Sequence, residues 1–178
     1  DLPSTLENAR KWILIGLYIG QRVSDLLNLK PSQLRFIENG VYIDINQQKT
    51  DKYVTVGVVD KEVIQILKKN FPYSISAQLF NRQIKQICQI AGIYEMVSGY
   101  KLCIKTRRKR LGTHPKYSLI SSHDLRRSFA TNYFGKIETP ILMQITGHSK
   151  ESTFLSYIGS QVNKDTYADA FMKIAATL

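Results

Sequence analysis

The feature that most constrains the fold is one strand–turn–strand pattern in a chain whose other segments mostly follow helical spacing. Residues 41–45 (VYIDI) and 53–59 (YVTVGVV) are β-branched or alternate apolar with polar side chains, and Lys49-Thr50-Asp51-Lys52 lies between them. Two such runs around a short polar segment predict an antiparallel hairpin. We therefore expect a mainly α protein with a small antiparallel β-sheet, an α+β fold.

Helix signals lie on both sides of this hairpin. Ser4-Thr5-Leu6-Glu7 has the form of a capping box, which predicts a helix to about Ile19. A short helix is expected over 23–29, before Pro31. Asp60 and Ser76 are expected to cap helices that end near Asn70 and Gly92. Further helices are expected at about 122–134, 140–146, 150–158 and 164–176, with Thr139 as cap and Pro140 at the first helical position of the second.

The segment 93–119 shows no clear periodicity. It contains two glycines, a proline and the basic run Lys105-Thr106-Arg107-Arg108-Lys109-Arg110. We interpret it as an irregular basic loop, with short strands as an alternative.

The overall charge predicts a polyanionic partner. Lys and Arg total 25 against 14 Asp and Glu, a net charge of +11, and basic proteins bind nucleic acid with release of condensed counterions. The alternative is a basic protein that charge keeps in solution. With 178 residues, 43% of them hydrophobic, the chain suffices for one domain with a core. Its longest apolar run, Trp12 to Gly20, is less than half of a membrane span.

The two cysteines indicate neither a disulfide scaffold nor a zinc site. Cys88 is in helical phase with Ile84 and Ala91, so we expect it to be a buried small hydrophobe. We expect a reducing compartment.

Chemistry-bearing residues are concentrated in the last third of the chain. On the helix from His123, residues 125, 129 and 133 form an apolar stripe, which predicts that Arg126 is half-buried beside the stripe and that Arg127 projects outward. His123 and Arg126 share a face near a helix N-terminus, where a phosphate would be favoured. A surface pair is the alternative for an isolated His-x-x-Arg.

Gly147-His148-Ser149 follows on a predicted sharp turn, and Tyr157 lies nine residues beyond His148. Glycine allows the backbone to turn and to direct His148 toward a site. Taken alone, His148 could be solvated and Tyr157 could be a core residue beside Phe154 and Ile158.

Together these motifs resemble the tyrosine recombinase (phage integrase) family. The upstream motifs of that family are also present, in order: YIGQRVSDLLNL (18–29), which contains Arg22, and Gln48-Lys49-Thr50 between the predicted strands. The remaining motifs are HDLRRSFATNYF (123–134) and ITGHSKESTFLSYI (145–158). The residues within these motifs are similar to those of integrases of integrative and conjugative mobile elements. The resemblance covers the catalytic domain, residues 1–178, and leaves the family's amino-terminal DNA-clamping domain outside this chain.

This resemblance implies a DNA recombinase that cleaves and rejoins strands. Tyr157 would attack the scissile phosphate to form a 3′-phosphotyrosine and release a 5′-hydroxyl, with no cofactor and no metal. Arg22, Arg126 and His148 would bind the non-bridging oxygens, and the surrounding cations would favour the phenolate of Tyr157. His123 would accept the tyrosine proton, and Lys49 would protonate the departing oxygen. Asp25 would orient its neighbours, with a surface ion pair as the alternative.

The resemblance also implies the surroundings of the protein. Double-stranded DNA is the expected partner, bound by a homo-oligomer that is a synaptic tetramer for the full-length protein, without membrane attachment. We expect a cytoplasmic, nucleoid-associated location. Lys105, Arg107, Arg108, Lys109 and Arg110 would contact DNA or form a solvated loop. Two positions depart from the common pattern: Arg127, which we expect to contact the DNA backbone, and Thr146, which replaces a commoner leucine and concerns local packing.

Three other classes fit part of this pattern. One is a relative that binds DNA without cleaving it, and another is a type IB topoisomerase. The third is a metal-dependent nuclease using His114, His123 and His148, although their spacing matches no metal signature.

Overall fold

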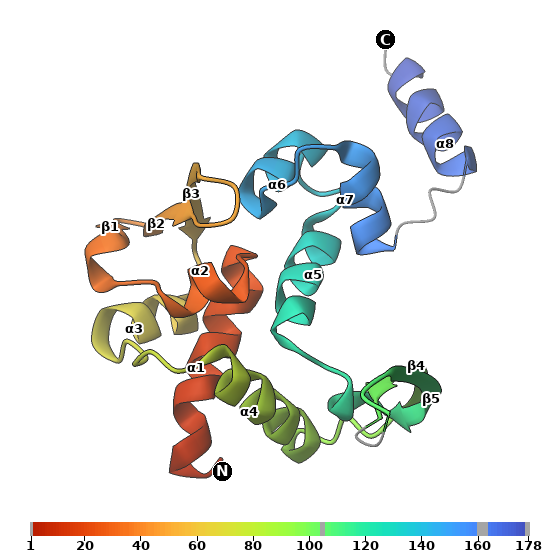
Figure 1. The fold of residues 1–178 in the computed structure, drawn as a ribbon. Helices are drawn as coiled ribbons and strands as arrows, with labels where there is room; N and C mark the ends of the chain where they lie inside the picture. The colour runs from red at the N-terminus through yellow and green to blue at the C-terminus, as the bar shows by residue number, and fades with distance from the viewer. Residues whose placement is uncertain (1, 104–105, 160–163, 177–178) are drawn as a thin grey trace.

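Helix α1 (Ser4–Ile19) is the central element of the larger part of the fold, where segments up to about residue 90 and the helix that begins at Ser122 pack against it (Figure 1). The computed structural model describes residues 2–103, 106–159 and 164–176, and the side chains of 164–167, 170 and 174 are outside this description. After α1 the chain forms α2 (Val23–Leu27), a 3-10 turn (Pro31–Gln33), strands β1 (Leu34–Ile37), β2 (Gly40–Gln47) and β3 (Lys52–Val58), and helices α3 (Lys61–Lys69) and α4 (Ala77–Ile90).

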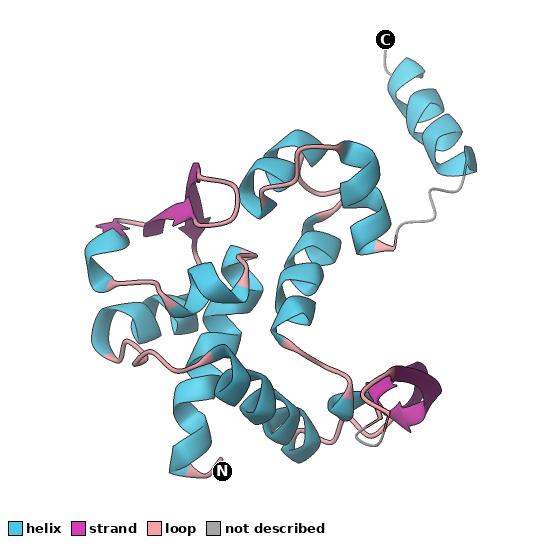
Figure 2. Ribbon diagram, in the orientation of Figure 1, coloured by secondary structure: helices cyan, strands magenta, loops and turns pink. Residues whose placement is uncertain are grey.

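A hairpin separates α4 from the remaining helices. It consists of β4 (Met96–Leu102) and β5 (Lys109–Pro115), followed by a 3-10 turn (Lys116–Ser118). Then come α5 (Ser122–Tyr133), α6 (Thr139–Thr146), α7 (Glu151–Ile158) and α8 (Lys164–Ala175), the last of which stands apart from the other helices in Figure 1. The described parts are therefore mainly helical with two small antiparallel sheets (Figure 2), which confirms the predicted fold class.

The predicted hairpin is confirmed as β2–β3, with Val41 opposite Val58 and Gln47 opposite Lys52. Side chains 41, 43 and 45 point to the core and 42 and 46 to solvent, as the alternation required. Strand β1 was not predicted; it pairs with β2 and is mostly exposed. The segment 93–119, predicted mainly as an irregular loop, instead contains the β4–β5 hairpin, in which Gly99 faces Gly112.

Two predicted helix caps were confirmed and two were wrong. Asp60 accepts a hydrogen bond from Val63 N–H at 3.0 Å and Ser76 from Leu79 N–H at 3.2 Å. The capping box at Ser4 does not form, because Pro3 is the N-cap and the Glu7 carboxylate is held by Arg10 at 3.0 Å. Helix α6 likewise begins one residue earlier than expected, at Thr139, with Glu138 as its N-cap.

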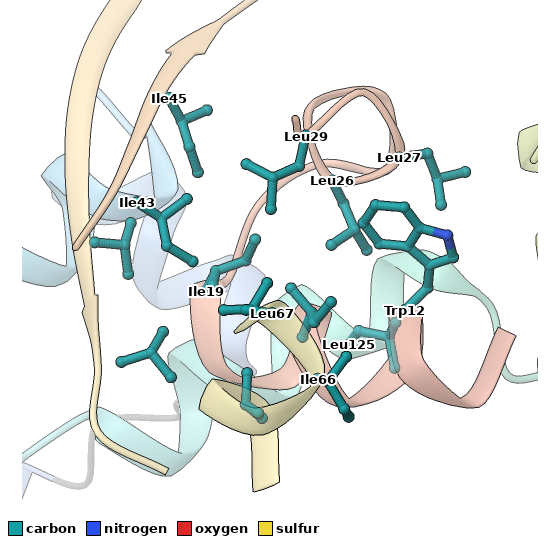
Figure 3. Packing of buried hydrophobic residues seen from close by; sticks show 14 of the residues in the cluster. Trp12, Ile19, Leu26, Leu27, Leu29, Ile43, Ile45, Ile66, Leu67 and Leu125 are labelled. Atoms are coloured by element: carbon teal, nitrogen blue, oxygen red, sulfur yellow. The ribbon is translucent and has the colours of Figure 1, made fainter. Parts of the chain in front are cut away.

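The core has two parts that meet along α5. The larger part packs α1 against the sheet, α3 and α4, around side chains shown in Figure 3 such as Trp12, Ile19, Ile43 and Leu67, all less than 4% exposed. The smaller part joins α5, α6 and α7 through Phe129, Ala130, Leu142 and Phe154. Leu125 belongs to the first part and Phe129, one turn later, to the second. Helix α5 therefore fixes the two halves of the chain relative to each other.

No helix in the described parts of the chain is both long and apolar enough to cross a membrane.

Candidate active site

The turn after α1 brings Arg22 to the beginning of α5. Gly20 ends α1 with φ +64°, and a Cβ at this position would collide with the ring of Phe129. Only glycine permits this close approach of the two helices. Arg22 is the N-cap residue of α2, and its Nη1 atom is buried without a hydrogen-bond partner among the described residues. An unsatisfied buried donor of this kind suits an anionic ligand.

Arg126 is buried on α5, only 3% exposed, between the two parts of the core. Its Nη1 donates to Gly20 O at 3.3 Å and its Nη2 donates to Thr146 O. A guanidinium has five N–H donors, so these bonds leave others for a ligand. Arg126 therefore links the ends of α1 and α6. It is fully buried and not half-buried, as helical phase had predicted.

Two buried glutamines join three distant segments beneath the site. Gln47 Nε2 donates to Gln21 Oε1 and to Ile145 O, each at 2.8 Å. Gln21 Nε2 donates to Ile19 O and also to Ile145 O, each at 2.9 Å. Both side chains are at most 2% exposed. This network, which the sequence analysis did not identify, ties the Arg22 turn, the β2–β3 hairpin and the end of α6 together.

Lys49 is exposed at the turn of the β2–β3 hairpin, and buried contacts position that turn. Asp25 is 5% exposed and its Oδ1 accepts a hydrogen bond from Gln48 N–H at 3.1 Å. Thr50 Oγ1 donates to Gln47 Oε1 at 2.8 Å. The alternative reading of Asp25 as a surface ion pair is wrong, because it is buried and is in none of the ion pairs among described residues.

His148 follows Gly147, which ends α6 with φ +65° as the sequence predicted. Its Nδ1 lies 2.8 Å from Thr146 Oγ1, and its ring packs edge-on against Phe154 with centroids 5.4 Å apart. The departure at Thr146 thus affects a site residue directly and not only local packing.

Tyr157 lies between the two predicted catalytic histidines. Its ring centroid is 5.0 Å from that of His123 and 5.0 Å from that of His148. The hydroxyl donates to the backbone carbonyl of His123 at 3.4 Å. Arg127 is exposed, as predicted, and its guanidinium carbon lies 5.5 Å from the Tyr157 ring centroid, a cation–π arrangement.

All six predicted catalytic side chains line one pocket of about 490 Å³. They come from the start of α2, the β2–β3 turn, α5, the turn after α6, and α7: Arg22, Lys49, His123, Arg126, His148 and Tyr157. Figure 1 shows these elements converging around the carboxyl ends of α1 and α6. The pocket also contains Gln21, Val23, Ser24 and Ser122.

Burial and mutual repulsion set the protonation states in this pocket. Burial, with the charge of Arg22 adding to it, lowers the pKa of Arg126 to about 10, so the side chain is still a cation at neutral pH. Burial lowers the pKa of His148 to about 4, and the charges of Arg126 and Arg22 act in the same direction. Burial and then Arg127 lower the pKa of His123. Both histidines are therefore neutral at pH 7.

The pKa of Tyr157 departs from the sequence expectation. We expected the surrounding cations to favour the phenolate. Burial instead raises the pKa of Tyr157, and Arg126 and Arg127 only partly oppose this. The hydroxyl is protonated at neutral pH, so attack by this oxygen requires a proton acceptor.

The other predicted residues lie elsewhere. Arg107, Arg108, Lys109 and Arg110 are exposed on the β4–β5 hairpin and do not line the pocket; Lys105 lies outside the described residues. His114, on β5, is not brought together with His123 and His148. Within the described ranges, no three His, Cys, Asp or Glu side chains group as metal ligands would.

Comparison with known proteins agrees with this arrangement. Residues 4–164 match the Phage integrase family. A tyrosine recombinase of Pseudothermotoga lettingae is 29% identical over 164 residues, which cover 88% of this chain and 52% of that protein. The chain thus spans about half the length of this curated relative.

Solved structures share the fold at low identity. The XerH site-specific recombinase bound to its difH substrate superposes with a TM-score of 0.64 at 20% identity, over 96% of this chain and 48% of that one. The Tn1549 transposon integrase in complex with circular intermediate DNA gives a TM-score of 0.65 at 16% identity, over 97% and 60% of the two chains. The chain belongs to the phage integrase family, the tyrosine recombinases.

Proposed function

We propose that this protein is a site-specific DNA recombinase that cleaves and rejoins DNA strands through a 3′-phosphotyrosine at Tyr157. The observation that carries the proposal is the convergence of Arg22, Lys49, His123, Arg126, His148 and Tyr157, from five separate segments, on one pocket. Residues 1–178 would form its catalytic domain.

Phosphate binding is supported by the charges in the pocket. Arg22 and Arg126 repel each other, and Arg22 Nη1 is buried without a partner among the described residues. A phosphodiester oxygen between the two guanidiniums would satisfy the free donor and remove the repulsion. In the transition state the phosphorus carries additional negative charge, and each preorganised donor is typically worth about 3 kcal/mol there.

The reaction is a transesterification. Tyr157 Oη would attack phosphorus, the bond from phosphorus to the 5′-oxygen would break, and the free energy of the phosphodiester would be kept in the protein linkage for rejoining. His123 is suited to take the tyrosine proton because it is neutral at pH 7 and its ring lies edge-on to Tyr157. The hydroxyl now donates to His123 O, so this transfer requires a rotation of the phenol or of the imidazole. Lys49 would supply a proton to the leaving 5′-oxygen.

Asp25 would act by positioning the β2–β3 turn. Its carboxylate holds the backbone of the β2–β3 turn at Gln48, and therefore the approach of Lys49 to the pocket. The exposed basic side chains of the β4–β5 hairpin, together with Arg127, would contact the DNA backbone, where such residues fix register without reading sequence. Lys105 is proposed for the same role from the sequence alone.

Double-stranded DNA is the proposed partner, and a homo-oligomer is the proposed active form. XerH and the Tn1549 integrase were both solved on DNA, and lambda integrase as a dimer on a core site. For the full-length protein we propose a synaptic tetramer that acts on the nucleoid in the cytoplasm.

Covalent trapping tests the proposal. The full-length protein is incubated with a library of nicked duplexes of randomised sequence, in which cleavage releases a short fragment and prevents rejoining. We expect protein–DNA adducts that survive denaturant, with the DNA linked to the peptide that contains Tyr157. The Tyr157→Phe variant should yield none while still binding DNA. Absence of any adduct would favour a DNA-binding relative without chemistry, and linkage to another tyrosine would overturn the nucleophile assignment.

Recovered duplexes then separate recombination from relaxation. Strand exchange between two recovered sites supports a recombinase. Relaxation of supercoils without strand exchange indicates the related topoisomerase activity instead.

A further inference from the structure

Thr146 is fully buried and its hydroxyl has two polar neighbours. Oγ1 donates to Leu142 O at 2.6 Å, one turn back in α6, and lies 2.8 Å from His148 Nδ1. The backbone after α6 imposes this contact, since Gly147 N–H donates to Gln144 O and His148 N–H to Met143 O. These two bonds form a Schellman motif, which folds His148 back over the end of the helix.

The proton count decides the tautomer of His148. A hydroxyl has a single proton, and a carbonyl oxygen can only accept. The Thr146 proton lies in the short bond to Leu142 O, so Oγ1 can only accept from His148. The imidazole must therefore carry a proton on Nδ1. In the neutral ring the other nitrogen, Nε2, then has a lone pair and no proton.

This tautomer is the wrong one for a phosphate. The non-bridging oxygens of a phosphodiester only accept hydrogen bonds, and a lone pair on Nε2 would repel them. With Nδ1 occupied by Thr146, Nε2 is the only polar ring atom left for a ligand in the pocket. His148 can donate to Thr146 from Nδ1 and to a phosphate from Nε2 only if both ring nitrogens carry a proton.

We propose that Thr146 makes His148 a proton-dependent phosphate ligand, which must take up one proton at Nε2 before it can bind the scissile phosphate of DNA. The inference rests on the proposed function for the identity of the ligand. The tautomer in the free protein follows from the geometry alone. Thr146 is here a positioning residue, because it acts through His148 and does not itself reach the pocket lining.

The groups around His148 explain why the free protein lacks this proton. Arg126 and His123 act on it from α5, Arg22 from the start of α2 and Lys52 from β3, and Tyr157 contacts its ring from α7. One carboxylate, that of Glu151 on α7, lines a neighbouring pocket with His148 and Lys52. The cations outnumber it, and they add to the burial that lowers the pKa of His148. A bound phosphate reverses the sign of the local field and stabilises the imidazolium. Phosphate binding and protonation of His148 therefore favour each other.

Because phosphate binding requires protonation of His148, affinity for phosphate should fall as pH rises. A ligand that requires one extra proton loses up to tenfold in affinity per pH unit between the pKa values of the free and bound states. Thr146→Val keeps the shape and removes the acceptor, so neutral His148 is free to carry its proton on Nε2 and donate without protonation. Thr146→Ser keeps the hydroxyl. The valine variant should lose the pH dependence due to His148, and the serine variant should retain it.

Histidine-selective ¹⁵N NMR of the full-length protein tests the tautomer. The signals of His114, His123 and His148 are assigned by replacing each with glutamine in turn, and inorganic sulfate, which stays a dianion throughout, serves as the probe anion. We expect His148 in the free wild type and in Thr146→Ser to be neutral with Nδ1 protonated, and sulfate to raise its pKa by at least one unit. In Thr146→Val the Nε2–H form should be populated. A neutral Nε2–H ring in the wild type would overturn the inference, whatever the trapping experiment shows.

A binding measurement tests the linkage. Affinity for a duplex recovered by trapping is measured between pH 5 and pH 8 on a Tyr157→Phe background, which prevents cleavage. Any pH dependence due to His123 is common to all the variants compared. The wild type and Thr146→Ser should weaken more steeply with pH than Thr146→Val, by at least tenfold across the range. Parallel curves would overturn the inference even if adducts form at Tyr157. If no adduct forms but sulfate still shifts His148 in the wild type alone, the anion linkage stands and the recombinase assignment fails.

Discussion

Gly147 lies so close to Gln47 that a Cβ on the glycine would collide with Gln47 Oε1. The contact joins the β2–β3 hairpin to the end of α6, where the backbone also requires a positive φ. A side chain at this point is therefore opposed by both the backbone conformation and the buried amide network.

Replacing Gly147 by alanine should destabilise the protein and separate the hairpin from His148. The left-handed backbone alone costs about 1–2 kcal/mol for a residue with a Cβ, and the collision adds to it. Gly92→Ala is the matched control, because Gly92 also has a positive φ and has nothing within 4 Å of a Cβ. Urea denaturation should show a larger loss for Gly147→Ala than for Gly92→Ala, with a loss of adduct formation only in the former. Equal losses would mean that the approach to Gln47 has no energetic consequence.

Arg22 and Arg126 should differ in their effects on stability and agree in their effects on cleavage. Arg126→Ala leaves Gly20 O and Thr146 O without their donor, which should cost about 2–4 kcal/mol of unfolding free energy. Arg22→Ala removes a cation that repels Arg126, so stability should stay within about 1 kcal/mol of wild type or rise. Adduct formation should fall by about 100-fold or more in each. Normal cleavage in either variant would remove that arginine from the proposed site.

Lys49→Ala should lose cleavage because the departing 5′-oxygen lacks an acid. A duplex with sulfur in place of that bridging oxygen should restore the rate, since a thiolate leaves without protonation. Lys52→Ala, three residues away at the start of β3, is the control, and its rate should not be restored selectively by sulfur. Failure of the sulfur substrate to rescue Lys49→Ala would assign the acid to another residue, with His123 the next candidate.

The lowered pKa of His148 predicts an acid-side loss of stability. With a folded-state pKa of about 4 and an ordinary value of about 6.5 in the unfolded chain, the unfolded state binds more protons between these values. The contribution is therefore complete above about pH 6.5 and is lost as pH falls toward 4. Because His148 is partly exposed, we expect about 1 kcal/mol, well below full conversion of the shift. Urea midpoints of the wild type and His148→Gln should converge as pH falls; a constant difference would contradict the lowered pKa.

Sequence patterns predicted the elements whose burial alternates or repeats. The β2–β3 hairpin was readable because residues 41, 43 and 45 are buried while 42 and 46 are not. Strand β1 is mostly exposed. In β4 the half-buried positions are Val97 and Gly99 while Met96 and Tyr100 are exposed, so apolar side chains do not mark its inward side. The Asp60 and Ser76 caps were readable because each side chain acts within its own turn. The capping box at Ser4 failed because Pro3 is the N-cap residue and the Glu7 carboxylate is paired with Arg10.

The site could be identified but not its supports. The motifs with Arg22, His123, His148 and Tyr157 carry their spacing in the sequence, whereas the Gln21–Gln47 contact joins residues 26 positions apart through a buried amide pair. Spacing indicates nothing about such a pair. The Thr146 contact depends on the turn at Gly147, and the raised pKa of Tyr157 depends on burial by α5 and α7. The first is a local contact whose side-chain geometry the predicted turn did not specify, and the second follows from tertiary packing.

The carbonyl of Ile145 accepts from both Gln21 and Gln47, and this shared oxygen has a consequence for biosynthesis. The Arg22 turn and the β2–β3 hairpin are synthesised first, and their glutamines lack this acceptor until α6 has emerged from the ribosome. A nascent or truncated chain would consequently lack an organised cutting centre. If the protein cleaves DNA as proposed, chains that end before this carbonyl would therefore not cleave it.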